Sequence, residues 1–262
     1  IDLGLKYFGF RWWHFFSAKN RFKERYKLNL DLIIDLQSKF RNTIILNRIP
    51  SKLFYSSTSN FFFSSVKKGL SKGKFDLEKT LENLEKITQN EIPSLKYKIN
   101  NIDKKYFEEA QRLLPNNNYI GFSLTQGNVY RKKTWEIEKF VNVANKLNHY
   151  NPVFFLGKKD LELIQLIKSR VKNALFPELD TKINCPALVT TLSTRLSKAI
   201  SIDNGIMHMI GLANIPMIVL FGPTNSDKFA PKIDNINILD SKILYNSNDI
   251  NLIKEEDVLS LI

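Results

Sequence analysis

Two loops of this chain carry residues suited to binding an anion. In the loop at 125–133, Gly127 has no side chain and lets the backbone approach a ligand. The loop ends on three adjacent cations, Arg131, Lys132 and Lys133, which could meet a negative charge. A basic loop of this kind is equally typical of a solvated surface. The GxxxxGK[ST] pattern is absent, which argues against a phosphate-loop nucleotide hydrolase.

The second loop, at 201–208, leads from an apolar run into a predicted helix that opens with Asp203, Asn204 and Gly205. Free backbone N–H groups and the helix dipole make such a helix start a phosphate site. The alternative is that Asp203 or Asn204 only caps the helix and that His208 is an ordinary core histidine. The residues of this loop leave both interpretations open.

A third loop begins at Gly222, Pro223 and Thr224, after the apolar run 217–221. Gly-Pro predicts a rigid turn that presents Thr224 towards the same side as the other loops. The sequence has no motif for nucleophilic catalysis by serine or for metal binding. No GxSxG nucleophile elbow is present, and the three histidines are scattered along the chain, so we expect neither a Ser-His-Asp triad nor a bound metal.

The 262 residues carry a formal net charge of +13, which indicates an anionic partner: nucleic acid, an acidic membrane surface or a phosphorylated small molecule. Residues 1–115 hold 22 Lys and Arg against 12 Asp and Glu, so most of the excess lies there. Residues 7–26 mix aromatic residues with cations and end in a basic tail, which fits a membrane-apposed helix or a plain core helix. No apolar run is long enough to span a bilayer, and we expect a cytoplasmic protein, peripheral on an acidic membrane at most.

The hydrophobic pattern predicts an α/β protein with a domain boundary at Pro115, which separates domains 1–115 and 116–262. Strands and helices alternate past this boundary, as in a doubly wound parallel sheet that binds ligands at the carboxyl ends of its strands. The expected strands are 30–36, 52–56, 119–124, 153–156, 199–202, 217–221 and 237–239. The expected helices are 7–26, 38–47, 76–88, 103–114, 134–147, 160–171, 187–198, 205–213 and 255–261.

In this order and spacing, the three loops resemble the lipopolysaccharide heptosyltransferases and their relatives in glycosyltransferase family 9. Most of the specificity lies in the two later blocks. The first block and a strand near the N-terminus are also similar to the family. The resembling residues are Ile120-Gly121-Phe122 to Gly127, Lys133-Thr134-Trp135, Asp203-Asn204-Gly205-Ile206-Met207-His208, Phe221-Gly222-Pro223-Thr224, and Leu32 to Gln37 with Arg41.

The resemblance implies a GT-B fold, in which two Rossmann-like doubly wound domains face each other and the second holds a nucleotide sugar. It implies an inverting transfer of a sugar, heptose from ADP-heptose, onto a lipopolysaccharide core acceptor bound on the side of the first domain. It implies neither a cofactor nor a metal, because a lysine and a helix N-terminus stabilise the departing diphosphate. The expected partners are therefore the donor, the acceptor and an anionic membrane surface, and not a nucleic acid.

The resemblance also assigns roles around the donor phosphates. Lys133 would neutralise the pyrophosphate, and Gly127 with Asn128 would shape the loop around it. Asn204 and Gly205 would offer backbone N–H groups to a phosphate at the start of their helix.

Further residues would contact other parts of the donor. Asp203 would contact the sugar, and His208 would steady the site from the first helical turn. Gly222 and Thr224 would border the donor, and Asp160 would hold the nucleotide ribose.

The sequence departs from the family in two places, one of which is Gly157-Lys158-Lys159-Asp160, where relatives tend to place the acidic residue for the ribose close after the glycine. The other is the position of the catalytic base. None of the ten glycines is followed by Asp, whereas the family places a Gly-Asp pair with the catalytic base after its first strand. The chain opens at Ile1, and its three methionines lie at 207, 209 and 217. We therefore expect the catalytic base upstream of Ile1 and an incomplete first domain. The alternative is an inactive module that binds nucleotide sugars. A nucleic-acid-binding function is disfavoured, because the sequence has no zinc-finger or RRM signature.

Overall fold

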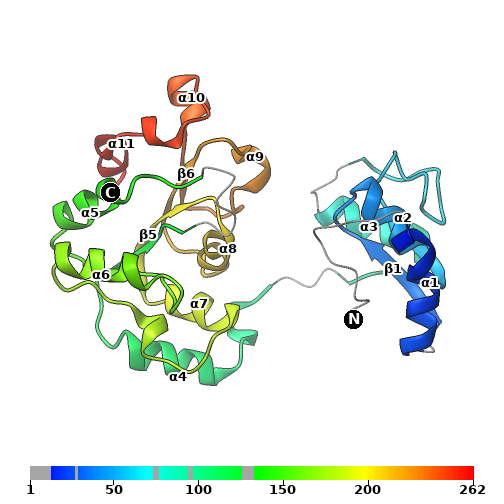
Figure 1. The fold of residues 1–262 in the computed structure, drawn as a ribbon, viewed down its shortest axis with the longest axis horizontal. Helices are drawn as coiled ribbons and strands as arrows, with labels where there is room; N and C mark the ends of the chain where they lie inside the picture. Colours follow the sequence, from blue (N-terminus) through cyan, green and yellow to red (C-terminus); the bar gives the residue numbers. More distant parts are fainter. Residues whose placement is uncertain (1–12, 27–28, 73–76, 94–96, 126–132) are drawn as a thin grey trace. The chain divides into compact units, whose positions relative to one another are not determined.

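The computed structural model describes residues 13–26, 29–72, 77–93, 97–125 and 133–262. The chain forms two compact units, Ile1–Lys96 and Tyr97–Ile262 (Figure 1). The division falls before the boundary expected at 115, because helix α4 (Lys104–Leu113) packs on the second unit. Its Ala110, together with Leu114, is buried against Leu188 and Leu192 of helix α7 (Pro186–Ser193).

The second unit is built on a parallel sheet with strand order β4-β3-β5-β6-β7 in the described residues. The chain leaves β3 for the edge strand β4 and then crosses back to β5 on the other side of β3. The strand order therefore reverses between β3 and β5, where doubly wound sheets bind ligands. The strands are β3 (Tyr119–Ser123), β4 (Asn151–Phe154), β5 (Leu196–Ile202), β6 (Met217–Phe221) and β7 (Ile236–Asp240).

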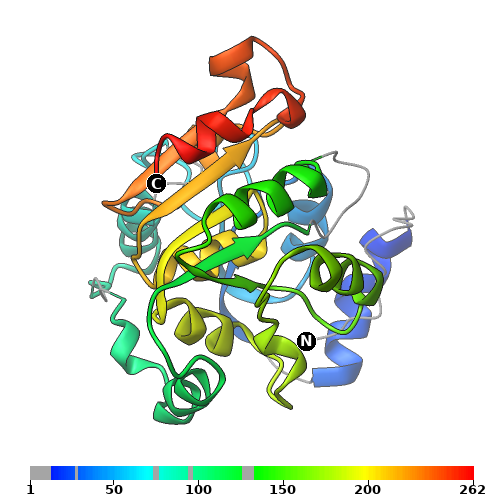
Figure 2. The same cartoon turned by 90° about the vertical axis from the view of Figure 1, so that its left-hand side faces the viewer.

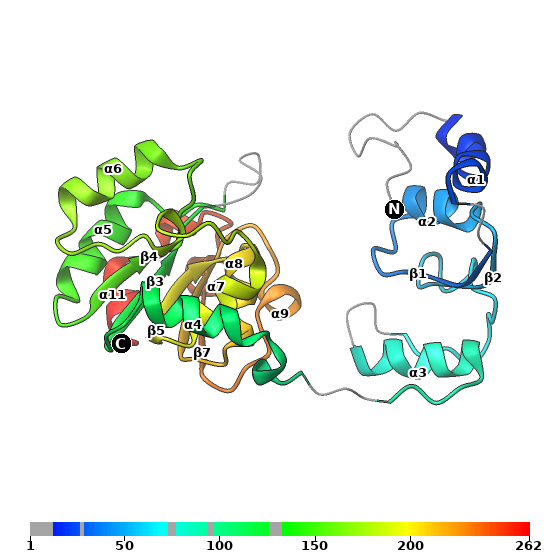
Figure 3. The ribbon, with the colours of Figure 1, turned by 90° about the horizontal axis from the view of Figure 1, so that it is seen from below.

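Helices cover both faces of this sheet (Figure 3). Helices α5 (Ile137–Lys146), α6 (Leu161–Arg170) and α11 (Glu255–Leu259) cover one face, and α4, α7 and α8 (Gly205–Leu212) cover the other. Side chains alternate between the faces along each strand. In β3, Ile120 and Phe122 join the first core, whereas Tyr119 joins the second. Helix α11 lies beside α5, where Glu255 accepts from Asn142 and Lys146 (Figure 2).

The structure corrects one predicted element and adds several short ones. The helix predicted for 187–198 ends at Ser193, and β5 begins at Leu196 because Leu196 pairs with Tyr119 of β3. Long-range strand pairing therefore overrides local helical spacing. Among the residues that the structure describes, the added helices are α9 (Ser226–Phe229), α10 (Ser241–Tyr245) and short 3-10 helices at Ile99–Asn101, Pro177–Leu179 and Ile250–Leu252.

The first unit contains α1 (Trp13–Tyr26), β1 (Leu30–Asp35), α2 (Phe40–Asn47), β2 (Ser51–Ser56) and α3 (Leu77–Thr88). In the described residues, β1 and β2 form a two-stranded parallel sheet. Phe22 of α1 packs with Phe54 on one side, and Leu84 of α3 packs with Tyr55 on the other. The opening helix expected at 7–26 is described from Trp13, and residues 1–12 lie outside the described part. Among the described residues, no helix is long and apolar enough to cross a bilayer.

A buried carboxylate joins the carboxyl ends of β1 and β2. Asp35 accepts from the backbone N–H groups of Gln37 at 3.1 Å and Ser38 at 3.2 Å. It also accepts from the hydroxyls of Ser56, at 3.0 Å, and Thr43. Because four donors satisfy this buried charge, Asp35 fixes the loop between β1 and α2.

We predict that Gly121→Ala destabilises the second unit by about 1–3 kcal/mol, because a larger side chain overfills a packed core. A Cβ at Gly121 would lie 2.5 Å from Leu196 Cδ1 and 3.2 Å from Phe155 Cε2. Urea unfolding followed by circular dichroism measures the loss. Gly157→Ala is the matched control, because a Cβ there meets nothing within 4 Å. Equal losses in the two variants would contradict this packing argument.

Candidate functional site

The three candidate loops leave neighbouring strands at one edge of the second sheet. Ser123 at the end of β3 pairs with Ser201 of β5, and Leu220 of β6 pairs with Ile202 of β5. The carboxyl ends of β3, β5 and β6 therefore meet at the point where the strand order reverses. Gly127 and Asn128 lie outside the described residues, which resume at Lys133.

Lys133 and Asp203 form a buried ion pair at this edge. The Lys133 ammonium donates to the Asp203 carboxylate and lies 3.5 Å from the Asp203 carbonyl oxygen. The two residues are only 9% and 7% exposed. A buried charge requires a partner of opposite sign, so each residue holds the other in place. The sequence predicted separate donor contacts for these residues, and the structure brings them together.

Trp135 anchors the backbone two residues after Lys133. Its side chain is fully buried, and its ring packs edge-to-face on Phe140 with the centroids 4.9 Å apart. The indole N–H donates to the carbonyl oxygen of Ile253 at 2.9 Å, and the Lys139 ammonium donates to the same oxygen at 3.3 Å. The C-terminal segment therefore fixes the position from which Lys133 reaches Asp203.

Asn204 connects the β3 exit to the start of α8. Its side-chain oxygen accepts from Met207 N at 2.8 Å and caps the helix. Its amide group donates to the Ser123 hydroxyl at 2.7 Å and to the Thr125 carbonyl at 2.9 Å. The N-cap, which the sequence left open between Asp203 and Asn204, is therefore Asn204, and the same side chain also connects two loops of the site.

The start of α8 is open for a ligand at Gly205. The N–H groups of Gly205 and Ile206 have no partner within the helix, because they precede its first hydrogen-bonded turn. Gly205 is exposed, and a Cβ there would meet nothing within 4 Å. His208 is exposed as well, so the interpretation of a core histidine is wrong. His208 is on the exposed side of α8 because Met207 and Ile210 occupy the side that faces the core.

The Gly222 loop is braced by the C-terminal segment. A Cβ at Gly222 would lie 2.8 Å from Ile250 Cβ, so glycine is needed here for close packing within the protein. The Lys242 ammonium donates to the carbonyls of Pro223 and Thr224, both at 3.1 Å. The Thr224 hydroxyl is buried and has no hydrogen-bond partner among the described residues. Contact of Gly222 and Thr224 with a donor stays a prediction.

The β4 side of the edge carries two carboxyl groups. Asp160 accepts from Gly157 N at 3.1 Å, which closes the turn after β4. The partly buried Glu178 was not predicted from the sequence. It follows a segment that extends the sheet beside β4, where Phe154 N donates to Leu175 O at 2.8 Å. Burial raises the pKa of Glu178, and the charge of Asp160 adds to this. A single acid within the apolar run 174–179 was the available signal.

We predict that Asn204→Ala lowers the free energy of unfolding by about 2–4 kcal/mol, because it removes a helix cap and leaves two polar groups unsatisfied. Asn225→Ala is the matched control. Asn225 caps α9 through the same bond, to Lys228 N at 2.9 Å, from an exposed position, and its loss should cost about 1 kcal/mol. Urea unfolding compares the two, and equal costs would show that the bonds to the β3 exit contribute nothing.

We predict that Glu178→Gln stabilises the protein at neutral pH and has no effect in acid. Below the ordinary value of 4.5, the carboxyl is protonated in both states and carries no buried charge. As the pH rises from there through the raised pKa of the folded state, ionisation of the Glu178 carboxyl becomes less favourable in the folded than in the unfolded protein. The free energy of unfolding of the wild type therefore falls relative to that of the Gln variant. Calorimetric melting between about pH 4 and pH 8 measures this divergence. Glu162→Gln, at an exposed position, is the control, and its melting temperature should follow that of the wild type over this range. A difference between Glu178→Gln and the wild type that does not change with pH would refute burial of the carboxyl as the cause.

Comparisons with known proteins agree with this geometry. A structure of a family 9 glycosyltransferase from Veillonella parvula is similar, with a TM-score of 0.68 and 21% identity over 96% of this chain and 78% of that one. The structure of the E. coli heptosyltransferase WaaC gives a TM-score of 0.64 and 16% identity over 93% of this chain and 75% of that one. The structure of E. coli ADP-heptose lps heptosyltransferase II gives a TM-score of 0.59 and 13% identity over 94% of this chain and 79% of that one. At these identities the likeness shows the fold, which is α/β with parallel sheets and GT-B-like.

A comparison with curated proteins finds no match. The model of one family does match, over residues 20–258, which is most of the chain and includes all the described residues of the site. Its description is glycosyltransferase family 9 (heptosyltransferase). The chain therefore belongs to glycosyltransferase family 9.

Proposed function

We propose that the second unit binds a nucleoside diphosphate sugar and that the protein transfers the sugar to an acceptor. The donor is ADP-heptose, and the acceptor is a lipopolysaccharide core at the cytoplasmic face of the inner membrane. The observation that carries the proposal is the buried Lys133–Asp203 pair beside the open start of α8, at the reversal of strand order. A cation and free N–H groups at this position suit a diphosphate.

The same groups can assist the departure of the nucleoside diphosphate. Negative charge grows on the diphosphate as the bond to the sugar breaks, and preorganised donors stabilise that charge without moving. Lys133 supplies an ammonium with three N–H donors, so it can contact a phosphate while it still contacts Asp203. Gly205 supplies a backbone N–H at the positive end of α8. Asp203 then keeps its ion pair with Lys133 and accepts a hydrogen bond from a hydroxyl of the donor sugar.

The other predicted donor contacts lie around this centre. Asp160 and Glu178 on the β4 side offer carboxyl oxygens for ribose hydroxyls. We keep Gly127, Asn128 and His208 as donor contacts, on the family resemblance of their motifs. Gly222 and Thr224 complete the proposed set. No described residue is proposed as the catalytic base.

Family membership and the ligands of relatives support this choice of donor. Solved structures of the E. coli heptosyltransferase WaaC contain ADP and ADP-2-deoxy-2-fluoro heptose. The first unit is proposed as the acceptor side. A module that binds nucleotide sugars without transferring them is the second candidate, because the sequence has no Gly-Asp pair to supply the family's base.

We predict that the protein binds ADP in calorimetry and that Lys133→Met weakens this binding about 10- to 100-fold, the cost of one charge-assisted contact. This variant leaves the Asp203 carboxylate buried without a partner and should also unfold more readily. The double variant Lys133→Met/Asp203→Asn removes both charges. It should regain stability while ADP binding stays weak, which separates a loss of binding from a loss of folding.

Lys232→Met removes an exposed cation from the segment that leads into β7, and ADP affinity should stay unchanged. Equal weakening in the Lys133 and Lys232 variants would reduce the site to general charge attraction. Release of ADP from ADP-heptose with a core acceptor then tests transfer itself. Tight ADP binding without release would favour the binding module.

A further inference from the structure

Two lysine side chains meet at the ring of Phe229, the last residue of α9. The Lys228 ammonium lies over this ring, 4.5 Å from its centroid, and the Lys133 ammonium lies over it at 6.0 Å. The electron-rich face of an aromatic ring attracts a cation over such distances. Phe229 therefore places a second ammonium group near the one that Asp203 holds in the buried ion pair.

Helix α9 is fixed to the edge of the sheet. The Ser226 hydroxyl donates to the carboxylate of Asp240, the last residue of β7, at 2.7 Å, and both residues are buried. Asp240 pairs with Phe221 of β6, so this bond connects α9 to the carboxyl ends of two strands. Just after α9, Pro231 packs on α8, where a Cβ at Gly211 would lie 2.7 Å from Pro231 Cβ. The aromatic ring at the end of α9 is thus held in place by the sheet and by α8.

The two lysines differ in their exposure to solvent. Lys133 is 9% exposed, whereas Lys228 lies on the surface. Phe229 is half-buried and packs on the core beneath α8, so its ring lies where the interior meets solvent. The two ammonium groups are no farther apart than the sum of their distances to the ring centroid. A ligand with two linked anionic groups can therefore contact both.

Charge balance favours such a contact. Lys133 and Asp203 have opposite charges, so the buried pair is neutral as a whole. A diphosphate that binds Lys133 therefore brings negative charge that the pair itself does not balance. Lys228 supplies a positive charge over the same aromatic ring. The contact of its ammonium group with a phosphate is a charge-assisted hydrogen bond, which is stronger than a neutral one.

We propose that Lys228 contacts the diphosphate of the donor together with Lys133, and that Phe229 positions both ammonium groups. The inference rests on the proposed function, because it adds a residue to the same donor site. Lys228 lies beyond the motifs that resemble the family, the last of which ends at Thr224. It extends the phosphate contacts from the exits of β3 and β5 to helix α9, which follows β6.

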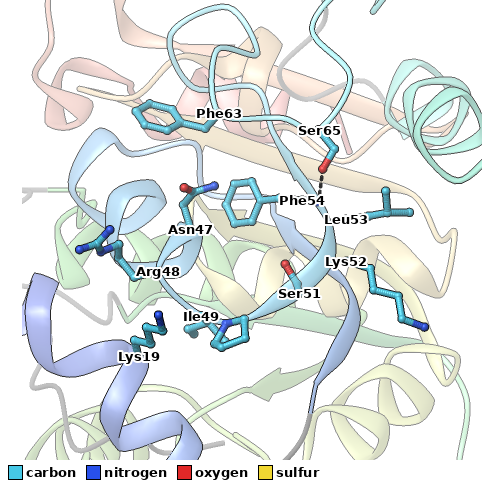
Figure 4. A pocket seen from close by; sticks show the side chains of 11 residues that line it. Lys19, Asn47, Arg48, Ile49, Ser51, Lys52, Leu53, Phe54, Phe63 and Ser65 are labelled. Carbon is cyan, nitrogen blue, oxygen red and sulfur yellow. Dashed lines mark hydrogen bonds between the residues drawn. The ribbon is translucent and has the colours of Figure 1, made fainter.

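A pocket of the first unit offers cations as well, and it serves as a comparison. Lys19 and Arg48 line this pocket of about 440 Å³, on the same side as Phe63 (Figure 4). Asn47, the last residue of α2, also lines it, so the negative end of the helix dipole lies there and disfavours a phosphate. We therefore expect the diphosphate at Lys228 and not in this pocket.

Calorimetric titration of the full chain with ADP and with adenosine tests the proposal. Lys228→Met should weaken ADP binding about three- to tenfold, less than Lys133→Met, because the lost contact is exposed to solvent. Adenosine has no phosphate, so its affinity should stay unchanged in Lys228→Met. Phe229→Leu should also weaken ADP binding, whereas Phe229→Tyr should bind like wild type, because tyrosine keeps an aromatic face.

Matched controls are Lys232→Met, which removes an exposed cation shortly after α9, and Lys19→Met, which removes an exposed cation from the pocket of the first unit. Both should bind ADP like wild type, and thermal unfolding identifies any variant that fails to fold. Wild-type ADP affinity in Lys228→Met, with weak binding in Lys133→Met, would overturn this inference and leave the proposed function standing.

Three further outcomes would count against Lys228 as a phosphate contact. Equal weakening in Lys228→Met and Lys232→Met would show general charge attraction. Weakening in Lys19→Met alone would place the diphosphate in the first unit, and an equal loss of ADP and adenosine affinity in Lys228→Met would show a contact outside the diphosphate. Failure of the wild type to bind ADP would overturn the proposed function and this inference together.

Discussion

The contact on which the candidate site depends is the buried ion pair of Lys133 and Asp203. Neither charge is stable in this place without the other, because the interior does not replace the water that each has lost. The two residues are 70 positions apart in the sequence. They meet because β3 and β5 are neighbours in the sheet, although α5, β4, α6 and α7 lie between them in the chain. Asn204 then fixes the distance between the two strand exits with bonds to both.

The C-terminal segment is the second constraint, and it acts on two loops at once. Ile253 accepts from the buried Trp135, and Ile250 packs where Gly222 has no side chain. One short stretch therefore holds both the approach to Lys133 and the turn after β6. Helix α11 completes this arrangement through its packing on α5 (Figure 2). The edge of the sheet is thus rigid on the protein side, while the start of α8 at Gly205 stays open to a ligand.

The first unit combines a firmly built interior with an exposed surface. The four bonds to Asp35 and the packing of α1 and α3 on opposite sides of β1 and β2 keep its sheet in register. Against this frame, the left-handed turn before Phe62 presents an aromatic residue to solvent next to Lys67.

Sequence alone determined the alternating elements of the second unit, because apolar runs such as Tyr119–Ser123 and Met217–Phe221 must be buried on both faces. It also identified the loops, whose Gly, Asn and Asp residues have local roles at strand exits and helix starts. Only the tertiary structure decided that Leu196 starts a strand, that Lys133 pairs with Asp203, that Gly222 makes room for Ile250 and that Glu178 is partly buried near Asp160. Each of these depends on a partner far along the chain, and local spacing carries no information about such partners.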